Sequence, residues 1–165
     1  MELRALAVVV GLGAAGCGPA DTVDSGTPED QLLELRNAGS ACLYGDGVPD
    51  GATTTLPASQ SAFASDAPVD ARVILDPCAS GCAHDIDASC TVRVVNTEVV
   101  IDATASWLEP TRGGCPAVCV PIAATCSGAP LADGVWVLDY GGGHSLEFTV
   151  PGTGPAPCAE ALTAM

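Results

Sequence analysis

The sequence of 165 residues contains no lysine, and its five basic side chains are all arginine. Twenty acidic residues outnumber them, so the formal net charge is −15 at pH 7. A surface with this balance repels the phosphate backbone of DNA and RNA, which makes nucleic acid an unfavourable partner. The acidic residues are spread along the chain rather than grouped in blocks, a pattern typical of a solvated surface.

Aromatic residues are also scarce, at 4% of the chain, with two each of tryptophan, tyrosine and phenylalanine. Aromatic rings normally contribute the largest buried areas to a protein core. The abundant alanine, glycine, valine and proline side chains bury little area each. We therefore expect a thin core that needs covalent cross-links.

The sequence also lacks an apolar run long enough for a membrane-spanning helix, which needs about 20 apolar residues. The main apolar run, Ala5–Ala15, is shorter than that and lies close to the amino terminus. Arg4 and the terminal amine precede it, and small residues end it, which is the layout of a secretory signal. This layout predicts export, with cleavage between Gly16 and Cys17.

Gly16-Cys17, preceded by small residues, resembles the lipobox of bacterial lipoproteins. The resemblance implies a signal peptide over residues 1–16 and lipidation of the Cys17 sulfur, so that acyl chains hold the protein at a membrane. Ala14 stands where leucine is usual, and cleavage without lipidation is the alternative. Gly18 is not the aspartate that favours inner-membrane retention in some lipoproteins. The resemblance therefore implies the outer membrane or cell surface, with a periplasm-facing position as the alternative.

Eight cysteines follow Cys17, and an even number in an exported chain indicates a disulfide framework. They are Cys42, Cys78, Cys82, Cys90, Cys115, Cys119, Cys126 and Cys158. The sequence does not choose among the many pairings that eight cysteines allow. Four bridges would contribute on the order of 10 kcal/mol, comparable with the net stability of an ordinary domain, so we expect reduction to unfold the protein.

Six of these cysteines form two triplets of similar spacing, Cys78-x3-Cys82-x7-Cys90 and Cys115-x3-Cys119-x6-Cys126. Each triplet precedes a stretch rich in β-forming residues, Thr91–Leu108 and Val135–Val150. The spacing suggests a duplicated unit of a cysteine knuckle and a hairpin, and chance similarity is the alternative.

Structural zinc is a competing interpretation of the first triplet. His84 lies between Cys82 and Cys90, and Asp85 and Asp87 are close in sequence. Cysteine and histidine clusters of this kind hold zinc in many domains. An oxidising compartment removes the thiolates that the metal needs. We therefore expect disulfides here, with no metal and no cofactor.

Residues 17–40 have the composition of an acidic tether, rich in glycine, proline, aspartate and serine. One short helix is expected within it, because Thr27 can cap a helix and Pro28 suits the first helical position. Gly39 would end this helix. Its small apolar face would consist of Leu32, Leu33 and Leu35.

Residues 41–165 are expected to form a single β domain. Short strands are predicted at Gln60–Ser65, Ala71–Leu75, Thr91–Val95, Glu98–Ala103, Val135–Tyr140 and Ser145–Val150. Alternating apolar and polar residues make the last two strands the clearest hairpin. One long bent strand is the alternative for the third and fourth. This pattern predicts a mostly β fold, a small disulfide-stapled β-sandwich, for which an immunoglobulin-like architecture is one option.

The segment from Asp46 to Asp50 resembles a piece of the calcium-binding thrombospondin type 3 repeat. That family supplies aspartates at alternating positions, because calcium takes 6–8 oxygen ligands. Cys42 and Tyr44 stand at the upstream positions here, so the ligand set is incomplete. A turn rich in glycine, proline and aspartate is the better interpretation, and calcium is the alternative.

Catalytic machinery is hard to find in this chain. His144-Ser145, with Asp139 nearby, contains a histidine and a serine, but no G-x-S-x-G motif surrounds the serine. We therefore predict no catalytic residue and a lipid-anchored envelope protein with a binding, adhesion or structural role, whose partner is an envelope protein or a glycan. A small inhibitor or carbohydrate-binding module, displaying the loops over 78–90 and 115–126, is the alternative. An exported hydrolase using His84 or His144 is the third.

Overall fold

The chain folds as β-structure throughout the described residues. The structure is a computed structural model and describes residues 29–49, 59–111, 113–145 and 147–162. The strands in these residues are β1 (Asp30–Arg36), β2 (Ser40–Tyr44), β3 (Gln60–Phe63), β4 (Asp70–Ala79), β5 (His84–Val95), β6 (Glu98–Pro110), β7 (Val120–Ser127), β8 (Gly134–Tyr140), β9 (Gly143–His144), β10 (Phe148–Val150), β11 (Gly152–Pro155) and β12 (Cys158–Glu160). This part of the chain contains no helix, and so none with the length and hydrophobicity to cross a membrane.

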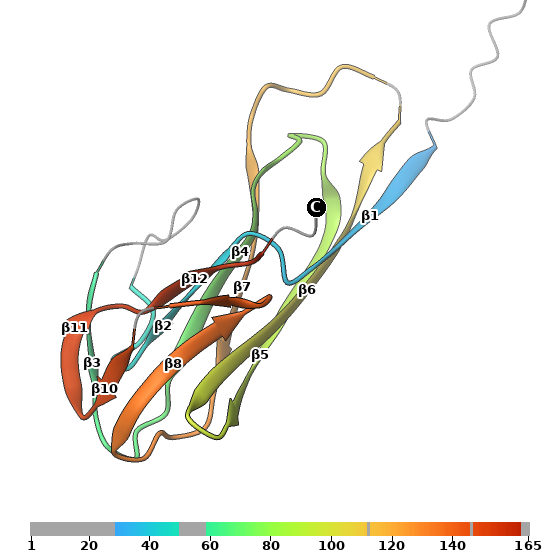
Figure 1. The fold of residues 1–165 in the computed structure, drawn as a ribbon. Helices are drawn as coiled ribbons and strands as arrows, with labels where there is room; N and C mark the ends of the chain where they lie inside the picture. Colours follow the sequence, from blue (N-terminus) through green and yellow to red (C-terminus); the bar gives the residue numbers. More distant parts are fainter. Residues whose placement is uncertain (1–28, 50–58, 112, 146, 163–165) are drawn as a thin grey trace, which may run out of the picture.

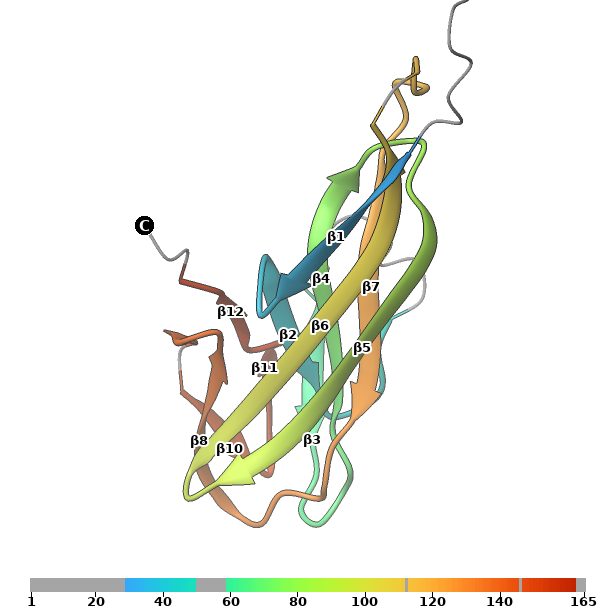
Figure 2. The same ribbon diagram turned by 90° about the vertical axis from the view of Figure 1, so that its right-hand side faces the viewer.

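The strands form two facing sheets and a small ribbon. The large sheet has the order β1-β6-β8-β10, with β5 added on β6 and β9 on β8. The second sheet has the order β12-β2-β4-β7, and β11 and β3 form a two-stranded ribbon. Figures 1 and 2 show an elongated molecule, with β1, β5 and β6 on one side and β2, β4 and β7 on the other. The expected mostly β, sandwich-type fold is confirmed.

Strand β6 is the longest strand, with 13 residues. β5 pairs antiparallel with it along one edge. Along the other edge, residues Thr104–Pro110 pair antiparallel with β1, and residues Glu98–Ile101 pair in parallel with β8. Alternate residues of β6, from Val99 to Trp107, are buried, because side chains along a strand point in turn to its two faces.

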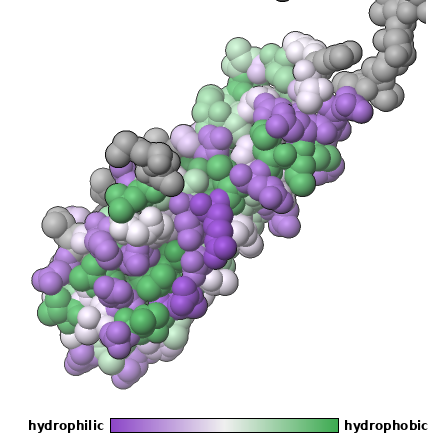
Figure 3. Space-filling model, turned by 45° about the vertical axis from the view of Figure 1, so that its right-hand side comes forward, coloured by the Kyte–Doolittle hydropathy of each residue, from purple (hydrophilic) through white to green (hydrophobic). Residues whose placement is uncertain are grey.

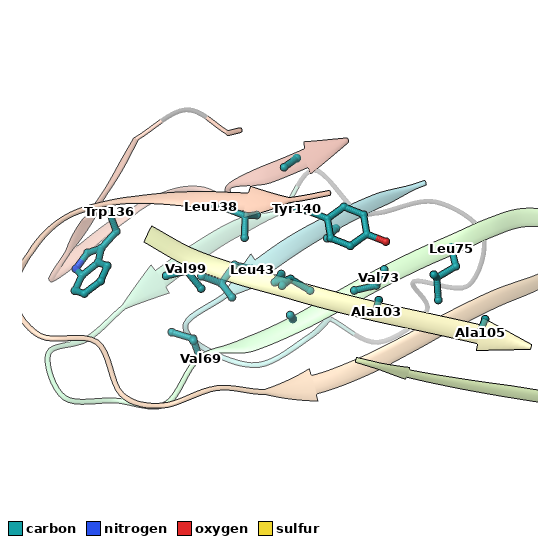
Figure 4. Close-up of a cluster of buried hydrophobic side chains, with 14 of the residues drawn as sticks. Leu43, Val69, Val73, Leu75, Val99, Ala103, Ala105, Trp136, Leu138 and Tyr140 are labelled. Atoms are coloured by element: carbon teal, nitrogen blue, oxygen red, sulfur yellow. The ribbon is translucent and has the colours of Figure 1, made fainter. Parts of the chain in front are cut away.

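The core lies between the two sheets. On β8, Trp136, Leu138 and Tyr140 point to the same side (Figure 4), and Leu138 and Tyr140 are completely buried. Burial raises the pKa of Tyr140, whose hydroxyl donates a hydrogen bond to the Ala38 carbonyl. The other labelled residues of this cluster are Leu43, Val69, Val73, Leu75, Val99, Ala103 and Ala105. Its alanines and few rings agree with the thin core expected from composition.

Residues 37–39 form the corner where the chain passes from the large sheet to the second sheet. Asn37 and Gly39 both have positive φ, at 44° and 70°. The Asn37 side-chain oxygen accepts a hydrogen bond from the Ala103 amide at 2.7 Å, and the Gly39 carbonyl accepts one from Ala161 at 2.9 Å. A Cβ at Gly39 would lie 2.1 Å from the Ile74 carbonyl oxygen, so a side chain does not fit there.

The helix expected between Thr27 and Gly39 is wrong, because Asp30–Arg36 forms strand β1. Leu33 and Leu35 are half-buried while their neighbours are exposed, which is the two-residue period of a strand. Pairing with β6 therefore overrides the local helix signals. Of the expected tether over residues 17–40, residues 17–28 lie outside the described residues, and Asp30–Arg36 is part of the large sheet.

Most of the expected strands are confirmed. Asn96-Thr97 joins β5 to β6 in an antiparallel hairpin with Val95 opposite Glu98, so the single bent strand is excluded. The expected hairpin after β8 is also confirmed, since Phe148 pairs with Trp136. Its second strand is shorter than expected, and Leu146 lies outside the described residues.

The eight cysteines after Cys17 form four disulfides, which confirms the expected framework. The bridges are Cys42–Cys158, Cys78–Cys119, Cys82–Cys115 and Cys90–Cys126. The first joins directly opposite residues of β2 and β12 within the second sheet. The last joins β5 of the large sheet to β7 of the second sheet, so it ties the two layers together at one side.

The two remaining bridges connect the end of β4 and the turn that follows it to the segment that precedes β7. All three bridges of the two triplets run from one triplet to the other rather than within a triplet. The triplets also occupy different elements, because the first runs from β4 of the second sheet into β5 of the large sheet, whereas the second leads into the single strand β7. Duplication of a unit stays a prediction.

Candidate functional site

The two bridges Cys78–Cys119 and Cys82–Cys115 close one end of the molecule, which we call the clipped end. His84 lies there, with Nδ1 3.0 Å from the Cys82 carbonyl oxygen and Nε2 3.3 Å from Asp30 Oδ2. The hydrogen bond to the carbonyl and the nearby carboxylate raise the pKa of His84. These contacts connect β1, β5 and the turn before β5.

The disulfides at this end remove the sulfur ligands that a zinc site would need. Cys82 and Cys90 are both oxidised in bridges, so neither offers a thiolate. His84 is engaged by Asp30 and the Cys82 carbonyl instead. In the described ranges, no group of three or more histidine, cysteine or acidic side chains is arranged to hold a metal ion.

Asp46, a candidate calcium ligand, has a contact within the fold. Its Oδ1 accepts a hydrogen bond from the Ser61 hydroxyl at 3.1 Å, and the same hydroxyl accepts one from the Gly45 amide at 2.9 Å. Ser61 is buried, so these bonds satisfy its hydroxyl and connect the end of β2 to β3. Asp50, the second candidate ligand, lies outside the described residues.

His144, Ser145 and Asp139 lie around the turn that follows β8. Asp139 pairs with His144 in the β8–β9 ladder, and its carboxylate accepts a hydrogen bond from the Gly142 amide at 3.2 Å. The Ser145 hydroxyl accepts one from the Leu138 amide at 3.2 Å. These contacts hold the turn, and a hydrolase role for His144 stays a prediction.

A polar network on the outer face of the large sheet was not expected from the sequence. Arg93 of β5 forms an ion pair with Asp102 of β6, and the Asn37 side-chain amide donates to the same carboxylate at 3.3 Å. These donors lower the pKa of Asp102, with the Arg93 hydrogen bond as the largest cause. The network fastens the corner at Asn37 to the middle of β6.

A shallow hollow of about 380 Å³ opens next to this network. It is lined mainly by polar side chains of three neighbouring strands, including Glu34 and Arg36 of β1, Asp87 and Ser89 of β5, and Thr104 and Ser106 of β6. Figure 3 shows hydrophobic and hydrophilic residues intermixed over one face of the molecule rather than separated into two areas. This face therefore resembles an ordinary solvated surface.

Among the described residues a second concave surface lies along β10 and β11, and we call it the Phe148 groove. Two adjoining hollows of about 260 and 330 Å³ share Glu147, Phe148 and Pro155 in their linings. The Phe148 ring packs against the Phe63 ring with centroids 4.7 Å apart. Glycines at positions 152 and 154 line one hollow, which leaves backbone groups accessible beside the aromatic ring. Aromatic walls with a few polar groups are typical of small-molecule sites.

Comparison with known proteins found no relative of this chain. No family model matches the chain, and no curated protein and no solved structure matches it either.

The sequence did not indicate the Phe148 groove. The alternation over Ser145–Val150 predicted Phe148 to be on a buried face, where it does pack against Phe63. The groove forms because the following chain turns back at Pro151 and β11 pairs with β3, far away in sequence. The only local signal was the glycine and proline content of residues 151–157.

Proposed function

We propose that this chain is an exported, lipid-anchored protein of the cell envelope that binds a partner there and catalyses no reaction. The observation that carries the proposal is that four disulfides use all eight cysteines after Cys17. Structural disulfides persist in oxidising compartments and are rare in the cytosol. They therefore support export, which the apolar segment Ala5–Ala15 indicates independently.

The path of the chain supports attachment at the clipped end. β1 begins there at Asp30, close to His84 and opposite Pro110. The strands β3, β10 and β11, which carry the Phe148 groove, gather at the opposite end of the elongated molecule (Figure 1). An anchor at Cys17, upstream of β1, would leave the groove directed away from the membrane and open to a partner.

Attachment at the clipped end disfavours the loops over 78–90 and 115–126 as a display surface. Two bridges join these loops to each other at the clipped end. An anchored chain would hold that end towards its own membrane. The inhibitor alternative, which needs these loops exposed to a protease or a similar target, is the weaker proposal.

Replacement of Cys17 by serine tests the anchor. We expect the protein from its native envelope to carry acyl chains on Cys17 and to fractionate with membranes. The Cys17→Ser variant should lose the acyl mass and appear in the soluble envelope fraction, because the remaining apolar surface does not replace the acyl chains. Intact-mass spectrometry and fractionation measure both. Unmodified wild-type protein in the soluble fraction would contradict the proposal.

A glycan is the partner class that the Phe148 groove favours, because an aromatic ring beside accessible polar groups suits the apolar face and hydroxyls of a sugar. We expect Phe148→Ala to weaken binding to purified envelope glycan about tenfold or more, the effect of removing a central aromatic contact. Val135→Ala, on exposed β8 surface, is the control. Pull-down and calorimetry measure binding, and thermal melts check the fold. Equal binding by both variants, or no binding by wild type, would contradict this assignment.

A further inference from the structure

In the part of the chain that the structure describes, strand β1 has a hydrogen-bonded neighbour on one side only. Its ladder with β6 runs from Asp30 opposite Pro110 to Arg36 opposite Thr104. Among the described residues no strand pairs with its other edge, and Figure 2 shows β1 beside β6 in the upper part of the large sheet. An open edge strand presents unpaired backbone groups that can pair with another strand.

The ladder determines which backbone groups face the open edge. The Thr111 amide donates to the Glu29 carbonyl, and the Asn37 amide donates to the Ala103 carbonyl. In an antiparallel pair every second residue bonds to the same partner. Odd-numbered residues of β1 therefore bond to β6, and the N–H and C=O groups of even-numbered residues point away from it. These residues are Asp30, Leu32, Glu34 and Arg36.

We propose that β1 pairs with β1 of a second copy of this chain, in an antiparallel register centred on Leu33. In this register Asp30 lies opposite Arg36 of the second copy, and Leu32 lies opposite its Glu34. All four are even-numbered residues, so their free N–H and C=O groups bond across the interface, as an antiparallel ladder requires. Leu33 lies on the two-fold axis in a non-hydrogen-bonded position.

The charges of the strand select this register. Asp30, Leu32, Glu34 and Arg36 are all exposed. In the register centred on Leu33, Asp30 of each copy lies opposite Arg36 of the other copy, which gives two attractive charge pairs. A shift by two residues in one direction would place Asp30 opposite Glu34, and in the other direction Glu34 opposite Glu34. Opposite charges directly across a ladder stabilise it and like charges destabilise it.

The apolar side chains also favour this arrangement. Leu32, with 58% of its surface exposed, lies diagonally across from Leu32 of the second copy. A monomer leaves this leucine in water. Because the pair is antiparallel, Asp30, the first residue of β1, lies at opposite ends of the interface in the two copies.

The test uses exported protein carrying Cys17→Ser, which has neither an anchor nor a cysteine outside the four bridges. Sedimentation velocity should show a monomer–dimer equilibrium at concentrations up to about 1 mM, the range of weak specific contacts. Asp30→Arg and Arg36→Asp should each raise the dimer dissociation constant at least about tenfold, because each turns two attractive pairs into repulsive ones. The double variant, which restores opposite charges, should return dimerisation to near the starting value.

Two further variants distinguish an effect on strand pairing from an effect of misfolding or of net charge. Leu32→Pro removes an N–H that faces the open edge, so it should abolish the dimer and leave the thermal melt of the monomer nearly unchanged. Asp133→Arg changes net charge as Asp30→Arg does but lies in the exposed segment before β8, so the dimer should persist. A monomer at every concentration, a dimer indifferent to Leu32→Pro, or a double variant that stays monomeric would overturn the proposal.

Discussion

Reduction of the four disulfides should unfold this protein under conditions in which the oxidised form is stable. The bridges close sequence separations of 116, 41, 33 and 36 residues. Each contributes about 2–4 kcal/mol, so together they supply on the order of 10 kcal/mol, against a net stability of about 5–15 kcal/mol for a typical domain. Circular dichroism during a urea titration, with and without a phosphine reductant, measures the difference.

Individual bridges should differ in this experiment. The pair Cys42→Ala/Cys158→Ala should cause the largest single loss, because it opens the longest loop, worth about 4–5 kcal/mol in the chain-entropy account. It also leaves β12 held by a ladder of only three residue pairs. Cys82→Ala/Cys115→Ala, at the exposed clipped end, is the matched control. A fully reduced protein with an unchanged urea midpoint would show that the thin core suffices alone.

Gly39→Ala should destabilise the protein severely, by about 4 kcal/mol or more, the range of backbone strain combined with steric overlap. Its φ of 70° is costly for alanine, and the added Cβ would approach the Ile74 carbonyl oxygen to 2.1 Å. Both strands at the corner are held by pairing, so neither can move away freely. Urea unfolding monitored by tryptophan fluorescence measures the loss.

Gly47→Ala is the matched control for this substitution. Gly47 also has positive φ, 93°, but no described residue lies within 4 Å of the position of its Cβ. The alanine should therefore cost only the backbone term, about 1–2 kcal/mol. Equal losses in the two variants would mean that the corner relaxes and that contact with Ile74 does not constrain it.

Local patterns predicted the parts of the fold in which neighbouring residues decide the structure. Trp136, Leu138 and Tyr140 alternate with residues facing outward, and this period identified β8 before any partner was known. Asn96-Thr97 identified the β5–β6 turn in the same way. The even number of cysteines after an export signal predicted the disulfides, since that inference needs only composition and compartment.

Strand β1 could not be predicted because its partner is distant in sequence. Thr27 and Pro28 are good helix-starting residues, and the three leucines at 32, 33 and 35 are compatible with a helix face. Strand β6, some 70 residues later, decides otherwise by pairing with all seven residues of β1. The cysteine pairings and the Phe148 groove were hidden for the same reason.

Candidate site residues were visible in the sequence, but their surroundings were not. His84 was weighed as a zinc ligand together with neighbouring cysteines or aspartates, and the carboxylate that it contacts belongs to Asp30, in the segment assigned to a tether. Asp46 was weighed as a calcium ligand, and Ser61 from another strand bonds to it. In both cases the residue type suggested a metal ligand. In the structure, contacts with residues distant in sequence give both side chains a structural role.

The direction of β1 has a mechanical consequence. The strand enters at the clipped end and runs along β6, and its backbone bonds to β6 lie across this direction. Tension on the chain before Asp30 therefore loads all of these bonds together in shear, instead of opening them one after another as in a zipper. A load pulling on the molecule from its amino-terminal side would be resisted by the whole length of the ladder at once.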